Sequence, residues 1–128
     1  KTINIEAKTM LSMMKKTFLP SVLSYCKELA ETAAKTKAIL PDAPISAESK
    51  LLEKLSGLYT EISEKTEALA EAEKAAESME DNIEKVTYFH YTILAKMDDL
   101  RSSVDTAEAL IPDFFLPYPT YDELLFSV

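Results

Sequence analysis

Apolar residues recur with helical spacing along most of the chain. The first stripe steps by four, three and four residues through Phe18, Val22, Tyr25 and Leu29. Pro20 lies inside this stripe, where it removes a backbone donor and clashes with the preceding turn, so we expect a kink or a helix restart near residues 16–19. Pro41 disfavours helix at the residue before it, which predicts that the first helix ends by Leu40.

A second stripe follows the loop at 41–46. It comprises Leu51, Leu55, Leu58, Ile62, Leu69, Ala72, Ala76 and Met79, and continues in nearly the same phase through Ile83, Val86, His90, Ile93, Met97, Leu100 and Val104. Lys65 is the one charged residue that interrupts this stripe. A lone helix of this length could not bury its stripe without partners. We therefore predict a break near residues 78–82, where Asp81 or Asn82 could cap a third helix.

These patterns predict an all-α fold. Helices over about 3–39, 46–78 and 82–111 would form a three-helix, antiparallel, up-down-up bundle across residues 1–113. Residues 114–128 would form an extended, Pro-rich C-terminal tail. The alternative is a single long helix over 51–107, which would require dimerisation or domain swapping.

Composition and charge narrow the class of protein. The 128 residues suit one domain, and the formal charge is -8. Residues 1–40 carry +4, residues 41–113 carry -10 and the tail adds -2, so the first helix should be attracted to the others. Net acidity argues against nucleic acid as a partner. The sequence contains neither a membrane-spanning apolar run nor a signal-peptide pattern, so we expect a cytoplasmic protein.

Candidate reactive residues are few. The only glycine is Gly57, so no Gly-rich phosphate loop exists. His90, the only histidine, falls on the apolar stripe and is expected to be a core or boundary residue rather than a ligand or base. Cys26 is alone and is expected to be a packed thiol. We predict no catalytic, metal-binding or cofactor-binding residue in this chain. The methionines Met10, Met13 and Met14 suggest core or inter-domain packing, with a peptide groove as the alternative.

The C-terminal stretch "PYPTYDELLFSV" resembles the closing signature of type III glutamine synthetases, the large bacterial form, which runs roughly W-P-x-P-T-Y-G-D-L-L-F-x-V. Leu116, Asp122 and Glu123 depart from that pattern, at its Trp, Gly and Asp positions. Similar stretches lie upstream, at 4–10, 18–30 and 97–111. The matching tail positions are Pro117, Pro119, Thr120, Tyr121, Leu124, Leu125, Phe126 and Val128.

The resemblance implies the C-terminal helical domain of a ring-forming, homo-oligomeric enzyme. The parent would make glutamine from glutamate, ammonia and ATP with a divalent metal such as Mg²⁺, and its Gly-rich catalytic motifs would lie upstream of this fragment. The chain, which opens on Lys1, would be a non-catalytic accessory or assembly domain. The tail would dock on the catalytic domain of the same or a neighbouring subunit through Pro117, Tyr118, Pro119, Thr120, Tyr121, Leu124, Leu125 and Phe126.

Three other interpretations stay open at this point. The tail could fold back and cover one end of its own bundle. The chain could be a free-standing helical adaptor that binds partners through its stripe or its tail. A small-molecule sensor with a cavity between helices ranks last, because nothing polar recurs on the stripes to orient a ligand.

Overall fold

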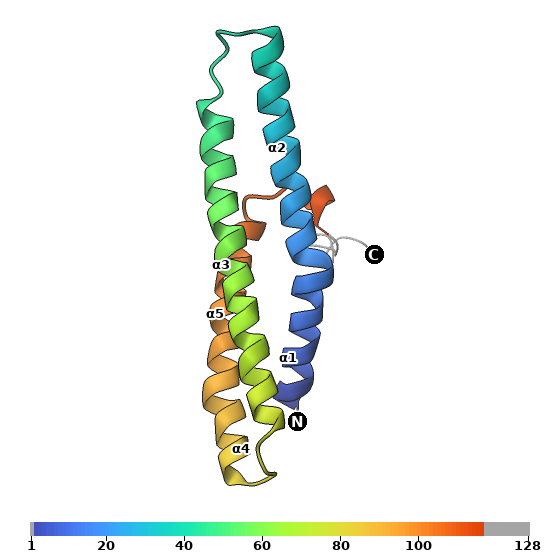
Figure 1. Cartoon of the computed structure of the whole chain (residues 1–128), viewed down its shortest axis with the longest axis vertical. Coiled ribbons are helices and arrows are strands. Elements are labelled where there is room, and N and C mark those ends of the chain that lie inside the picture. The colour runs from blue at the N-terminus through green and yellow to red at the C-terminus, as the bar shows by residue number, and fades with distance from the viewer. Residues whose placement is uncertain (1, 117–128) are drawn as a thin grey trace, which may run out of the picture.

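The computed structural model describes residues 2–116, which form three helical rods and, over that range, no strand. The chain direction reverses at two connections, so the rods run up, down and up (Figure 1). The second rod contacts both of the others, and the first also touches the third. The predicted all-α fold with three helices is confirmed for the described residues. The tail residues from 117 onward lie outside them.

The first rod contains a π-helical turn just before its proline. α1 (Thr2–Met13) passes into η1 (Met14–Phe18) and then α2 (Leu19–Ile39), and the Leu19 N–H donates to the carbonyl of Met14, five residues back. Pro20 supplies no N–H, and the wider turn accommodates its ring. The Ser21 hydroxyl donates instead to the Thr17 carbonyl at 2.8 Å. The disturbance predicted from Pro20 is therefore a single π turn inside a continuous rod.

The second rod is the uninterrupted α3 (Ser46–Glu77). It begins after the loop that contains Pro41, and no side chain caps its N-terminus. It ends at Glu77, and the chain turns through residues 78–82. The break expected near residues 78–82 is present, so the single long helix over 51–107 is wrong.

The third rod starts at a side-chain cap. Asn82 Oδ1 accepts hydrogen bonds from the backbone N–H groups of Glu84, at 2.9 Å, and Lys85, at 3.3 Å. α4 (Ile83–Tyr88) leads through a second π turn, η2 (Phe89–Ile93), into α5 (Leu94–Glu108). No proline marks this second turn. Pro112 then follows the rod in extended conformation and starts the short 3₁₀ helix η3 (Asp113–Phe115).

The core lies where three rods run together. We call residues 2–22 and 55–111 the three-helix section, since every buried residue of the described chain falls there. Its wholly enclosed large side chains are Phe18, Val22, Leu55, Ile62, Thr66, Leu69, Ile93, Met97 and Leu100.

Beyond the end of α5, only two helices continue. The C-terminal part of α2 and the N-terminal part of α3 project past the third rod as a hairpin (Figure 1). We call residues 23–54 the distal arm. None of these residues is buried, although Leu29 and Leu51 are partly covered along the helix seam. Apart from η3 (Asp113–Phe115), which packs on Tyr25 at the base of the arm, no described element forms a third layer here.

Candidate docking site and the polar contacts around it

The docking residues predicted from the sequence, Pro117 to Phe126, lie outside the described residues. The structure does place the segment that leads to them. The Phe115 ring packs against Tyr25 of α2, with ring centroids 5.0 Å apart, and Leu116 packs against the core cluster. Phe114 is 84% exposed. After α5 the chain therefore passes over α2 at the base of the distal arm. The Phe115 ring packs there on Tyr25, and the Phe114 ring faces solvent.

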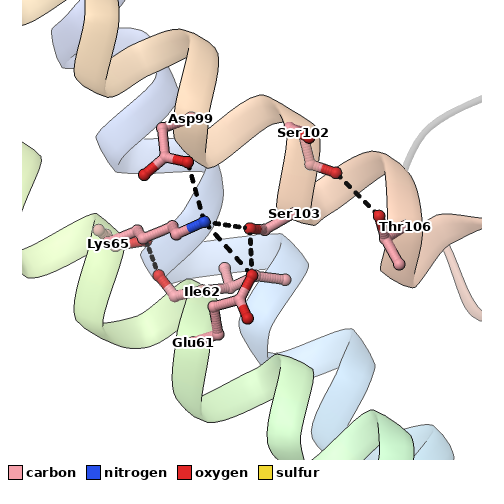
Figure 2. Close-up of polar contacts among 8 residues, drawn as sticks. Glu61, Ile62, Lys65, Asp99, Ser102, Ser103 and Thr106 are labelled. Carbon is pink, nitrogen blue, oxygen red and sulfur yellow. Dashed lines mark hydrogen bonds and ion pairs between the residues drawn. The ribbon is translucent and has the colours of Figure 1, made fainter.

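A polar bridge joins α3 to α5 at the middle of the bundle (Figure 2). The Lys65 ammonium donates to Asp99 Oδ1 at 3.0 Å and to the Ser103 hydroxyl at 2.7 Å. The Ser103 hydroxyl in turn donates to the Glu61 carboxylate. The hydrogen bond to Asp99 raises the pKa of Lys65, and the one from Ser103 lowers the pKa of Glu61. Both groups are thereby held in their charged forms.

This bridge explains the one charged residue on the second stripe. Lys65 lies beside the seam, and Thr66 takes the buried position. The Thr66 hydroxyl is satisfied by the Ile62 carbonyl at 2.7 Å. Lys65 therefore links α3 to α5, a contact that its sequence position did not predict.

A second charged cluster joins α1 to α3. Lys8 Nζ lies 3.0 Å from Glu77 Oε2 and 3.7 Å from Glu73 Oε2. Glu73 is buried, and this burial raises its pKa, whereas the hydrogen bond from Lys8 lowers the pKa of Glu77. Sequence reasoning missed Glu73 because it sits in an acidic run. The available signal was its position four residues after Leu69 and three before Ala76, both of them core residues.

His90 is exposed, so the expectation of a core or boundary histidine is wrong. It meets the Tyr91 ring edge-on at 4.8 Å. Ile83 and Val86, its neighbours on the predicted stripe, are also exposed, at 75% and 62%. The extra residue in η2 rotates the helix before it relative to the helix after it. Tyr88 and Phe89 consequently pack on the core instead.

Cys26, Met10 and Met14 occupy packing positions, whereas Met13 is exposed. Partial burial raises the pKa of the Cys26 thiol, which disfavours the reactive thiolate. Met14 is buried, while Met10 and Met13 border an open groove of about 650 Å³ between α1 and α5. Arg101 and Asp105 form part of its polar rim. The buried residues at the floor of the groove fit the packing interpretation of the methionines. Its open mouth fits the alternative, a peptide groove.

Among the described residues, no cluster of three potential metal ligands occurs, and no helix is long and apolar enough to cross a membrane. The titratable groups that do converge form ion pairs between helices. Their geometry suits a scaffold that holds its helices in fixed register.

Comparison with known proteins identifies the family. Residues 1–37 match the family model described as the glutamine synthetase C-terminal domain. The whole chain aligns with a glutamine synthetase from Butyrivibrio fibrisolvens at 38% identity over 128 residues, which are 18% of that relative's length. No solved structure matches the chain. An alignment at this identity along the whole chain indicates common descent. The chain belongs to the glutamine synthetase C-terminal domain family.

Proposed function

We propose that this chain is the non-catalytic C-terminal accessory domain of a type III glutamine synthetase, where it braces subunit assembly or relays conformational change to the active site. The parent would join glutamate and ammonia at the expense of ATP, in the cytoplasm, as a homo-oligomeric ring. The single observation that carries this proposal is the 38% identity along all 128 residues to a protein named glutamine synthetase. A free-standing adaptor would not be expected to align over its whole length with one part of an enzyme.

The polar residues described here do not fit the ATP and divalent metal that the parent would use. The densest cluster, around Lys65, places an ammonium group between two carboxylates and a hydroxyl. A metal ion there would meet a positive charge, and the carboxylates are already occupied. Gly57, the only glycine, lies inside α3 and so cannot form a phosphate-binding loop. Substrate chemistry in the parent would therefore belong to its other domains.

The contacts between the helices suit a bracing role. Ion pairs tie α3 to both of the other rods, through Lys8 on one side and Lys65 on the other. A rod held in this way can transmit a displacement from one end to the other, because a close-packed core deforms little. The tail would provide the attachment. Its prolines reduce the entropy lost on docking, and its aromatic and leucine side chains supply apolar contact area.

The test is made in the full-length parent enzyme. Leu124→Asp with Phe126→Asp should reduce the oligomer mass, measured by light scattering, or the rate of ATP-dependent glutamine formation. The matched control is Asp122→Asn with Glu123→Gln, which alters the same segment without burying charge. An unchanged oligomer mass together with unchanged turnover in the Asp variant would refute the docking role of the tail. A parent that lacks glutamine synthetase activity altogether would refute the enzyme assignment.

A further inference from the structure

The groove between α1 and α5 presents apolar side chains to solvent on one concave face. Ile5 and Met13 are 65% and 40% exposed there, beside the partly buried Met10 and the buried Met14. Val104 of α5 lines the facing wall. Single exposed apolar residues are normal on a protein surface, but several of them gathered in one hollow are typical of a binding site. Methionine side chains in particular adapt their shape to an irregular partner.

The described chain ends close to one end of this groove. The groove extends to Met14 on the first rod and to Glu108, the last residue of α5. The chain then crosses from α5 to α2, where the Phe115 ring packs on Tyr25 (Figure 1). Tyr25 follows Met14 along the same continuous rod at a distance of about 17 Å, at 1.5 Å per residue. Residues 117–128 therefore start within a short distance of the groove.

The length of the tail suits the length of the groove. Its two prolines, both near its start, favour an extended conformation. At about 3.1–3.3 Å per residue, an extended tail would carry Leu124 about 25 Å and Phe126 about 32 Å beyond the end of the described chain. Along the first rod, Met10 lies about 22 Å and Ile5 about 30 Å from Tyr25, at 1.5 Å per residue. The two apolar side chains of the tail would therefore come level with the two apolar side chains of the groove.

Composition and tethering both favour the tail as the occupant. Residues 117–128 contain no Lys or Arg, and their only charged side chains are Asp122 and Glu123. The rim of the groove includes Arg101 but also carboxylates such as Asp105. Attraction between the two would therefore be apolar rather than ionic. A short flexible tether supplies an effective concentration in the millimolar range, so a modest apolar attraction is sufficient to fill the groove.

We propose that residues 117–128 fold back into the groove between α1 and α5, with Leu124 and Phe126 against Met10 and Ile5. The contact is inferred from the burial and geometry of this chain and does not depend on the enzyme assignment. Its consequence for the parent rests on the proposed function. The same tail side chains would be covered while they lie in the groove, so the catalytic domain would have to displace them. The groove would then compete with the docking surface of the parent for the tail.

The first experiment compares the 128-residue chain with a chain that ends at Leu116, both with isotope-labelled methionine methyl groups, by nuclear magnetic resonance. We expect the signals of Met10 and Met13 to shift when the tail is removed, because their methyl groups lose an adjacent aromatic ring. Met79 follows α3 and does not line the groove, so its signal should not change. The shifts should not depend on protein concentration, because the contact lies within one chain.

A peptide of residues 117–128, added to the shortened chain, measures the affinity. We expect a dissociation constant of about 0.1–1 mM, a value at which a millimolar effective concentration fills the groove. Met13→Glu should weaken peptide binding at least about tenfold, because it places a carboxylate against the apolar side chains of the tail. The matched control is Leu23→Glu, which adds the same charge at a comparably exposed apolar position on the same rod, outside the groove. This control should stay within about twofold of the unaltered chain.

Four outcomes would overturn the proposal. The signals of Met10 and Met13 would stay unchanged without the tail, or their shifts would depend on concentration, which would place the tail on another copy. Met13→Glu and Leu23→Glu would weaken peptide binding equally, or added salt would weaken it, which would make the contact ionic. Circular dichroism confirms that each variant is folded, and Thr9→Glu, at an exposed position of the same groove, replaces Met13→Glu if that variant fails to fold. None of these outcomes bears on the enzyme assignment, which the activity of the parent decides.

Discussion

The three-helix section and the distal arm both contain parts of α2 and α3, but only the three-helix section has α5 beside them. The two regions therefore differ in how completely their apolar side chains are buried. Where α5 is present, side chains such as Leu69 and Phe18 are fully enclosed. Where it is absent, leucines with the same helical spacing remain partly exposed. An amphipathic stripe therefore supplies apolar side chains, and the number of neighbouring helices decides whether those side chains become a buried core.

The largest expected effect compares one leucine from each region. Leu69→Ala should lower the free energy of unfolding by about 2–5 kcal/mol, because it leaves a cavity inside the core. Leu29→Ala, on the half-open seam of the arm, should cost less than about 1.5 kcal/mol, because part of its surface is already in water. Urea denaturation measures both. Equal losses would mean that the arm is packed as tightly as the section below it.

The next effect compares the helix starts of the two regions. Asn82→Ala should destabilise by about 1 kcal/mol, since two backbone N–H groups lose their acceptor. Ser46→Ala, at the arm end of α3, should change the free energy of unfolding by less than about 0.5 kcal/mol, because no side chain caps that helix. Thermal and urea unfolding of the two variants test this difference. A loss at Ser46 as large as that at Asn82 would contradict it.

Gly57 lies just beyond the base of the arm, where the bundle becomes three-layered. A Cβ built at this position meets no atom within 4 Å, so alanine fits without strain. Gly57→Ala should raise the free energy of unfolding by about 0.5–1 kcal/mol, since glycine loses more backbone entropy in a helix. Thermal unfolding at matched protein concentration measures the change. If Gly57→Ala instead destabilised the isolated chain, the face of α3 at this position would not be open, and the expected gain would be refuted.

The smallest effect concerns two carboxylates of the three-helix section, one helical turn apart. Burial raises the folded-state pKa of Glu73, so the folded chain binds this proton more tightly and gains stability as pH falls through that pKa. Lys8 lowers the folded-state pKa of Glu77, so its contribution is present above the unfolded pKa and is lost as pH falls. Glu73→Gln should therefore stabilise at pH 7 and Glu77→Gln should destabilise. Both differences should shrink in acid.

Unfolding curves at pH 7 and below the usual range of carboxyl pKa values provide the measurement. Glu67→Gln, at an exposed position on the same helix, is the control. If Glu73→Gln and Glu77→Gln shift the free energy of unfolding in the same direction at pH 7, the assigned pairing around Lys8 is wrong.

Much of this architecture follows from local sequence signals. Pro20 indicated where the first rod would be disturbed, and Asn82 indicated where the third rod would begin. Both signals are local, since one residue type decides whether a backbone donor or a capping acceptor exists. The second π turn carried no such signal. It has no proline, and its effect is to place Tyr88 and Phe89 on a core that other helices supply.

The sequence by itself determined the helices, their approximate limits and the stripe that each one offers. Only the tertiary structure decided which stripe residues are buried. It turned His90 outward and drew Lys65 into a bridge with Asp99 and Ser103. It also left the distal arm beyond Tyr25 without a third layer among the described residues. Helical periodicity reports the face that a residue shares with its neighbours, whereas burial depends on how many other helices reach that face and on every extra residue that rotates it.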